Sequence, residues 1–266
     1  MTTLAALTLQ LAKIVVPVQE ATASANGTTQ TLIDLVNVRG DNYFRGGEIW
    51  FLSGTNAGKI ALVTAYQRAT GKFTFSPALA NPTVVGDLYA ANAGRYKHVA
   101  LVKAINTALL SLGPVRTENT ALTVVDGQEE YSLPAGVRNV CKVEILQNTT
   151  SPYVPYEHLR WDEIPGVTPK LRFDANWLPS AGCTIRLTYN AAPTELFAYN
   201  DTVSDYIPIE RIAWSAAVAF LRSLFQDLRV MPAVTVNLYN EAKAQETAML
   251  ARPLPLADKS PRFSGW

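Results

Sequence analysis

Two hydrophobic periods alternate along this 266-residue chain and divide it into helical and strand-like stretches. In the first stretch Leu4, Leu7, Leu11 and Ile14 follow helical spacing, which predicts a helix within residues 1–19. Alternate positions of the same stretch are also apolar, so a strand is the competing interpretation there.

Residues 20–94 have the two-residue period of β-strands and are predicted to form a small β-barrel-like module. The strand-like runs are Thr31–Val36, Glu48–Leu52, Lys59–Tyr66 and Lys72–Phe75. Clusters of Gly, Asn and Asp separate these runs and are typical of turns.

Helical spacing returns in residues 95–119, where apolar residues recur from Tyr96 to Leu112 and Gly113-Pro114 ends the run. A second β region, predicted to be β-sandwich-like, covers residues 120–205. Its strands include segments 131–133 and 171–173 and the stretches around Cys141 and Cys183. Each cysteine shares the apolar face of its strand, so we interpret both as buried hydrophobic residues rather than as a disulfide.

A continuous apolar stripe at period 3.6 predicts C-terminal helices within residues 206–251. The first helix runs from about Pro208 to Leu228, and the second from near Pro232 to Leu250. The stripe residues that we expect to pack in a core or between subunits are Ile212, Ala216, Ala217, Phe220 and Leu224. Its alanines permit close helix approach.

Residues 252–266 contain three prolines and no periodicity, which predicts an extended arm. Its apolar residues are Leu254, Leu256, Phe263 and Trp266. An extended arm cannot bury these side chains by itself, so they are predicted to dock on a partner, a disordered terminus being the alternative. Altogether the patterns predict an α+β fold with a core of N-terminal, central and C-terminal helices, two β regions and this arm.

Composition narrows the functional classes. The chain has 23 basic and 22 acidic residues, a net charge of +1, and gives no general electrostatic reason to bind nucleic acid. Charged residues make up 17%, below the quarter typical of soluble domains, which suggests that much of the surface meets other protein. No apolar run reaches the roughly 18 residues of a membrane span, and Leu4–Val16 lacks the preceding positive charge of a secretory signal.

The stretch from Phe51 to Tyr66, "FLSGTNAGKIALVTAY", has the order of glycines and lysine found in phosphate-binding loops. Such a loop needs four residues between its glycines, a hydroxyl residue after the lysine, and a helix behind it. Gly54 and Gly58 enclose three residues, Ile60 follows Lys59, and the next residues read as a strand. We interpret the cluster as a glycine-rich hairpin loop.

Other catalytic or binding patterns are weak. His98 is expected on the surface of the central helix and His158 in a loop. Neither is accompanied by a glycine-flanked serine or a reactive cysteine that could act as a nucleophile. The carboxylate pairs Glu129-Glu130 and Asp162-Glu163 read as solvated loop ends, and the histidines and cysteines lack metal-ligand spacing. We predict no enzyme activity, no metal and no cofactor. The scattered basic residues, including Lys97 and Arg222, are interpreted as solvated surface.

Three stretches resemble tailed-bacteriophage virion proteins, in particular the head-to-tail connector (adaptor) proteins of the neck. The first is "NYFRGGEIWFLSGTNAGKIALVTAYQRATGKFTFSPAL" followed by "VVGDLYAA", which looks like a small β-barrel of phage structural proteins. The second is "VALVKAINTALLSLG" followed by "EEYSLPAGVRNVCKVEIL", a helix leading into a β-sandwich. The third is "CTIRLTYNAAPTEL" followed by "DYIPIERIAWSAAVAFLRSLF", a strand leading into an alanine-rich helix.

The resemblance implies a structural subunit, assembled in the host cytoplasm and located in the virion neck between capsid and tail. Such adaptors form a ring, commonly of twelve copies, that joins the portal protein to the next neck or tail protein and extends the DNA channel. Genomic DNA then passes through without sequence-specific binding, and no membrane is involved. The alternative is a β-rich tail or collar component that binds a receptor, glycan or fibre, for which Trp161 and Trp177 near loops are candidates.

Overall fold

The computed structural model describes residues 2–94, 96–146, 152–156, 160–227 and 233–254. The backbone separates into two compact units. The first is built from the chain up to Ser111 together with Thr194–Arg252, and the second contains Leu112–Pro193. Since the chain leaves the first unit and returns to it, the second unit is an insertion.

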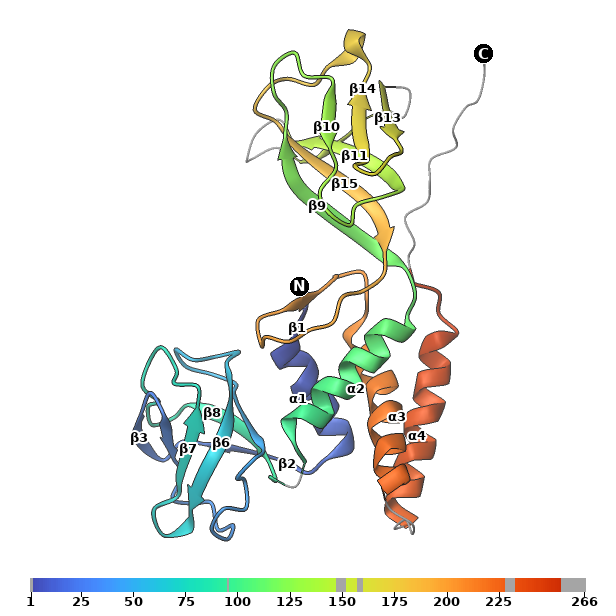
Figure 1. Ribbon diagram of the computed structural model, residues 1–266. Helices are drawn as coiled ribbons and strands as arrows, with labels where there is room; N and C mark the ends of the chain where they lie inside the picture. The colour runs from blue at the N-terminus through green and yellow to red at the C-terminus, as the bar shows by residue number, and fades with distance from the viewer. Residues whose placement is uncertain (1, 95, 147–151, 157–159, 228–232, 255–266) are drawn as a thin grey trace. The chain divides into compact units, whose positions relative to one another are not determined.

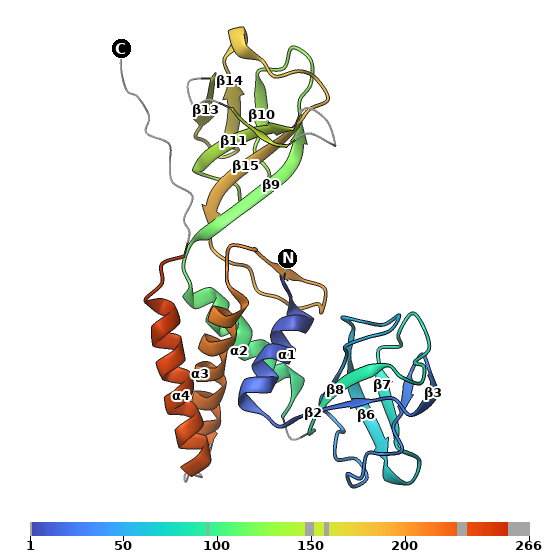
Figure 2. The same cartoon turned by 180° about the vertical axis from the view of Figure 1, so that it is seen from behind.

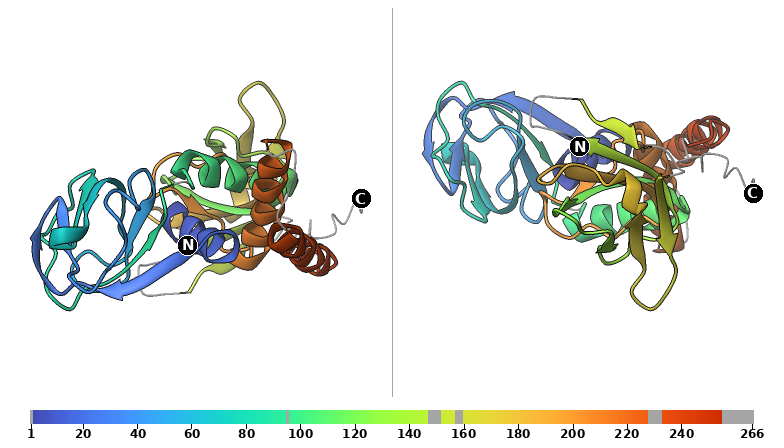
Figure 3. Two further views of the ribbon diagram at one scale, coloured as in Figure 1. Left: turned by 90° about the horizontal axis from the view of Figure 1, so that it is seen from below. Right: turned by 90° about the horizontal axis from the view of Figure 1, so that it is seen from above.

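Among the residues that the structure describes, four α-helices form the helical part of the first unit. They are α1 (Leu4–Val15), α2 (His98–Ser111), α3 (Ile209–Asp227) and α4 (Ala233–Leu250). Thr3 caps α1, because its Oγ1 accepts a hydrogen bond from Ala6 N at 3.3 Å. The helix α3 packs against α1, α2 and α4, and it lies beside α4 in every view (Figures 1 and 2, and Figure 3). The helices predicted at the N-terminus, in the centre and at the C-terminus are confirmed.

The chain ends of this helical part are tied by a short sheet. Strand β1 (Thr2–Thr3) pairs antiparallel with β16 (Thr202–Val203), and Leu4 N donates to Asp201 O at 2.9 Å. These bonds hold the start of α1 beside the segment that leads into α3. This pairing has no signal in the sequence, because two-residue strands are too short to show a hydrophobic period.

The first β region is an antiparallel sheet with the strand order β2-β8-β5-β6-β7-β4-β3. Its strands are β2 (Val18–Thr22), β3 (Ala25–Thr28), β4 (Thr31–Ile33), β5 (Glu48–Phe51), β6 (Ile60–Gln67), β7 (Lys72–Ser76) and β8 (Leu88–Asn92). No described pairing joins β2 to β3, so the expected barrel is not closed. The two edges are nevertheless consecutive in the chain, and the sheet encloses a core that includes Phe44, Tyr66 and Phe73.

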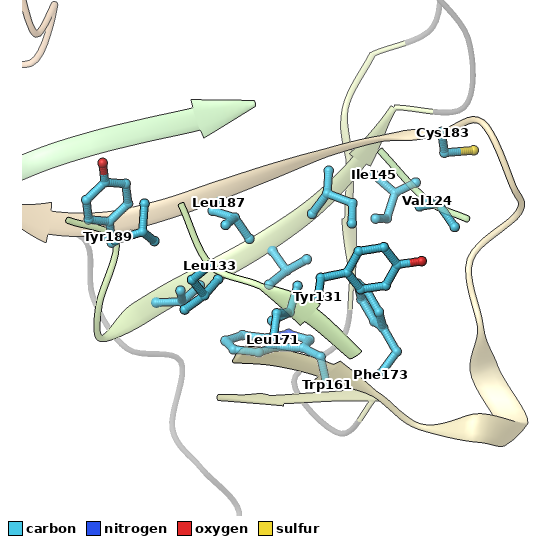
Figure 4. Packing of buried hydrophobic residues seen from close by; sticks show 14 residues of the cluster. Val124, Tyr131, Leu133, Ile145, Trp161, Leu171, Phe173, Cys183, Leu187 and Tyr189 are labelled. Atoms are coloured by element: carbon cyan, nitrogen blue, oxygen red, sulfur yellow. The ribbon is translucent and has the colours of Figure 1, made fainter. Parts of the chain in front are cut away.

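The described residues of the second unit form two antiparallel sheets around one core. The four-stranded sheet has the order β12-β11-β15-β9, and the three-stranded sheet has the order β10-β14-β13. Their strands are β9 (Val115–Thr123), β10 (Glu130–Ser132), β11 (Val140–Leu146), β12 (Val154–Tyr156), β13 (Trp161–Ile164), β14 (Lys170–Phe173) and β15 (Thr184–Ala191). Figure 4 shows Leu171 and Phe173 facing Ile145 across this core.

The first and last strands of the second unit are neighbours. Strand β9 pairs with β15, with Val115 opposite Ala191, so the chain enters and leaves this unit at adjacent positions. Because its two ends are adjacent, the second unit can be inserted in the sequence between α2 and Thr194 while the helices of the first unit stay packed together.

Candidate functional site

The glycine cluster around Lys59 is a hairpin loop. Strands β5 and β6 pair antiparallel, with Trp50 opposite Ile60, and Gly58 N donates to Phe51 O at 2.8 Å. Gly54 and Gly58 both have positive φ, as turn glycines do. A strand rather than a helix follows Lys59, so this loop lacks the helix N-terminus that would hold phosphates, and the hairpin interpretation is confirmed.

The prediction that His98 lies on the helix surface is wrong. His98 begins α2, is about four-fifths buried, and its Nδ1 forms a hydrogen bond with Oε1 of the fully buried Glu48 in β5. Its ring also meets that of Tyr199 edge-on, with 5.2 Å between the centroids. The helical period placed His98 on α2 correctly, but it does not report that the β sheet covers the start of this helix.

Burial has the largest effect on the pKa values of Glu48 and Tyr199, which form a cluster with His98. It raises the pKa of the Glu48 carboxyl, and the hydrogen bond and charge of His98 offset this only in part. Burial and the nearby Glu48 carboxyl raise the pKa of Tyr199 to about 12. A second bond between the same parts of the unit joins Trp50 Nε1 to Thr8 Oγ1 at 3.2 Å. The cluster therefore fastens the β region to the helices.

The other titratable residues singled out in the sequence occupy structural positions. Cys141 and Cys183 are buried and form no disulfide, as expected. Glu130 pairs with Lys170 Nζ at 2.7 Å, and Glu163 accepts hydrogen bonds from the backbone N–H groups of residues 139 and 140. Within the described ranges no group of three or more His, Cys, Asp or Glu residues is arranged to hold a metal. His158 lies outside the described residues.

The predicted packing stripe of α3 lies mainly inside the first unit. Ile212, Ala216, Ala217 and Phe220 are buried in the single chain, and Leu224 is half-buried. These side chains are therefore occupied by the subunit's own core, and any contact between copies has to use other surfaces.

Only the beginning of the predicted docking arm is described. Leu254 is half-buried, and Arg211 Nη1 donates to Arg252 O at 2.7 Å, which fixes the chain where α4 ends. Leu256, Phe263 and Trp266 lie outside the described residues, so their docking role stays a prediction.

A groove of about 540 Å³ lies between α2 and α3. Its apolar lining includes the small residues Ala100, Ala104 and Ala219, and its charged lining residues are Lys97, Lys103 and Arg222. Lys97 and Arg222 were predicted to be solvated surface residues with no relation to each other. Helix packing brings them together although 125 positions separate them in the chain, and no local pattern signals this.

A smaller pocket of about 360 Å³ lies in the second unit. Trp177, which is 53% exposed, and Tyr156 contribute aromatic surface to it, and Asn176 and Ser180 contribute polar groups. The Arg160 guanidinium lies 4.2 Å from the centroid of the Trp177 ring. Trp161, the other tryptophan considered for ligand contact, is instead buried in the core of the unit, because β13 turns it inward.

No protein-family model and no curated protein matches the chain. A chain of a solved structure described as the "Neck of empty GTA particle computed with C6 symmetry" aligns with 54% of this chain and 75% of its own length. The identity is 17% and the TM-score is 0.24, too low to establish a common fold. Among the described helices, none has both the length and the apolarity needed to cross a membrane.

Proposed function

We propose that this protein is a non-enzymatic structural subunit of a phage neck that forms a homo-oligomeric ring. Its sequence resemblance to head-to-tail adaptors motivates the proposal. The structural observation that supports it is the set of large apolar side chains exposed on α2, on α4 and in the loop before α3. Val99, Leu110, Phe197 and Leu250 are each exposed over at least half of their surface. Exposed apolar side chains of this size favour burial against other protein.

In this role the subunit joins the portal protein on the head side to the next neck or tail protein. Neighbouring copies, twelve in the commonest adaptor ring, enclose and extend the DNA channel. The net charge of +1 suits such a channel, because tight phosphate binding would hold the DNA that has to slide through it. The location is the virion neck, after assembly in the host cytoplasm.

The direct test is the composition and structure of purified particles. We expect mass spectrometry to find the chain in virions and cryo-electron microscopy to place a ring of it between portal and tail. Absence of the chain from purified particles would exclude the neck function.

The C-terminal arm is proposed to attach the subunit to the portal or to an adjacent copy. Removal of residues 255–266 keeps the Arg211–Arg252 hydrogen bond and every described helix and strand, so the truncated chain is expected to fold. It is expected to lose co-sedimentation with tailless heads, because the anchors Phe263 and Trp266 are gone. Binding equal to that of the full-length chain would show that the arm is passive.

The pocket beside Trp177 favours a second candidate function, a β-rich tail or collar component that binds glycans. A half-exposed aromatic ring next to the guanidinium, amide and hydroxyl groups of Arg160, Asn176 and Ser180 supplies a flat apolar face and hydrogen bonds, the usual composition of a ligand pocket. A glycan array with the wild type and with Trp177→Ala tests it. Phe197→Ala, which removes an exposed aromatic residue from the other unit, is the control. An array without binding would reject this alternative.

A further inference from the structure

We propose that the groove between α2 and α3 of one copy binds the loop around Phe197 of a second copy of this chain. The inference rests on the proposed homo-oligomer and names the two surfaces that form its repeating contact. One surface supplies a rigid aromatic anchor beside acidic side chains, and the other supplies an apolar groove with a cationic lining.

Phe197 is an unusual surface residue, because it is 74% exposed and yet held in a fixed loop. The preceding residue, Leu196, is buried and bonded through its backbone to Asn106 of α2. The following backbone is fixed as well, since the N–H groups of Phe197 and Ala198 donate to Asp201 Oδ2 at 2.7 and 2.8 Å. An anchor that is already ordered loses little conformational entropy on binding, which makes it suited to a protein interface.

The loop is also acidic. Residues 194–204 contain Glu195 and Asp201 and no Lys or Arg. Glu195 is exposed two positions before Phe197, and no ion pair of Glu195 occurs within the described part of the chain. The partner surface that suits this loop therefore combines apolar area with positive charge.

The α2–α3 groove has both properties. Lys97, Lys103 and Arg222 line it, and none of the three has an ion pair within the described residues. Lys13 and Lys170 are paired with Glu20 and Glu130, whereas the groove brings close together three cations that are unpaired in the described ranges. Three uncompensated cations around one groove repel one another, and an acidic segment would relieve that repulsion.

The apolar part of the groove fits a single aromatic side chain. Ala100, Ala104 and Ala219 have only methyl side chains, so the groove of about 540 Å³ is open down to the helix surfaces. Because the loop and the groove are different surfaces, the contact is heterologous, and repetition of it closes a ring when the rotation between copies allows.

The experiment measures association of the full-length chain by native mass spectrometry and sedimentation over a range of concentrations. We expect the wild type to associate, and Phe197→Ala and Lys103→Glu each to weaken association by about tenfold or more. Glu195→Lys is expected to weaken it less, because the aromatic anchor remains. The double variant Glu195→Lys/Lys103→Glu, which exchanges the charges, is expected to associate better than Lys103→Glu alone. Val167→Ala alters a side chain that is 99% exposed in the second unit and serves as the control.

Association that is unchanged in both Phe197→Ala and Lys103→Glu would overturn this contact, as would a wild type that stays monomeric throughout. A double variant no better than Lys103→Glu would equally overturn the pairing of loop and groove. The neck function is tested separately, by whether the chain is present in purified particles. If the chain is found in the neck and its assembly is unchanged by these substitutions, the loop–groove contact is refuted and the neck function is not.

Discussion

Asn106 in α2 holds Leu196 through both atoms of its side-chain amide. Asn106 Nδ2 donates to Leu196 O and Asn106 Oδ1 accepts from Leu196 N, each at 2.9 Å. The two residues are 90 positions apart, because the whole second unit lies between them in the chain. This bidentate contact fixes the point at which the chain returns to the helical part of the first unit.

Replacement of Asn106 by Ala is therefore expected to destabilise the first unit by about 2 kcal/mol or more, because the buried backbone N–H and C=O of Leu196 lose their partner. Urea denaturation followed by circular dichroism measures the change. Asn240→Ala on the exposed side of α4 is the control and should stay within about 0.5 kcal/mol of the wild type. Equal stability of the two variants would contradict this role of Asn106.

The glycine-rich hairpin loop offers a matched pair of substitutions. Gly54 and Gly58 have almost the same φ, +76° and +77°. A Cβ at Gly58 meets nothing within 4 Å, whereas a Cβ at Gly54 would overlap Asp87 Oδ1. We expect Gly58→Ala to cost about 1 kcal/mol from the left-handed backbone alone, and Gly54→Ala to cost clearly more. Thermal denaturation of both variants checks the order, and the reverse order would refute it.

The stability of the second unit is expected to depend on pH through Glu144. Burial alone would raise the pKa of this carboxyl, but hydrogen bonds from Lys142 and Arg186 together with their charges hold the pKa below its ordinary value of 4.5. A folded-state pKa below the unfolded one stabilises the fold above the unfolded pKa, and this stability is lost as the pH falls through the folded pKa.

We therefore expect the urea concentration at the midpoint of unfolding of the second unit to fall as the pH drops below about 4.5. NMR signals from backbone amides of β11 and β15 report this unfolding. Glu144→Gln should flatten this dependence. Glu130→Gln is the control, since Lys170 also lowers the pKa of Glu130 but the pair is solvent-exposed and contributes little. An unaltered acid dependence in Glu144→Gln would rule out Glu144 as its source.

Phe220 tests the core of the helical unit. It is 1% exposed, and Phe220→Ala is expected to cost about 3–5 kcal/mol through lost burial and a residual cavity. Phe197→Ala makes the same chemical change at an exposed site and should cost less than about 0.5 kcal/mol at concentrations where the chain is monomeric. Chemical denaturation compares the two. Comparable losses would mean that α3 is not packed as described.

The sequence alone determined the alternation of helical and β regions, although it missed short strands and the nine-residue β9, which begins within the predicted central helical segment 95–119. The 3.6-residue period of α3 and the alternation around Cys141 and Cys183 report local backbone geometry, which each segment adopts largely by burying one face. For the same reason the residues between Gly54 and Ile60 were enough to identify a hairpin, since the spacing and the following strand are local features. The helices, the α+β class and the buried cysteines follow from such short-range patterns.

Tertiary structure decided the rest. No described pairing closes the sheet between β2 and β3, and His98 lies against the buried Glu48. Trp161 is buried in the core of the second unit, and Lys97 and Arg222 line the same groove. These relationships join residues that are distant in the chain, and a periodic pattern shows which face of an element is buried but not what buries it. The partner of each face depends on how all elements pack together, so it can be read only from the folded chain.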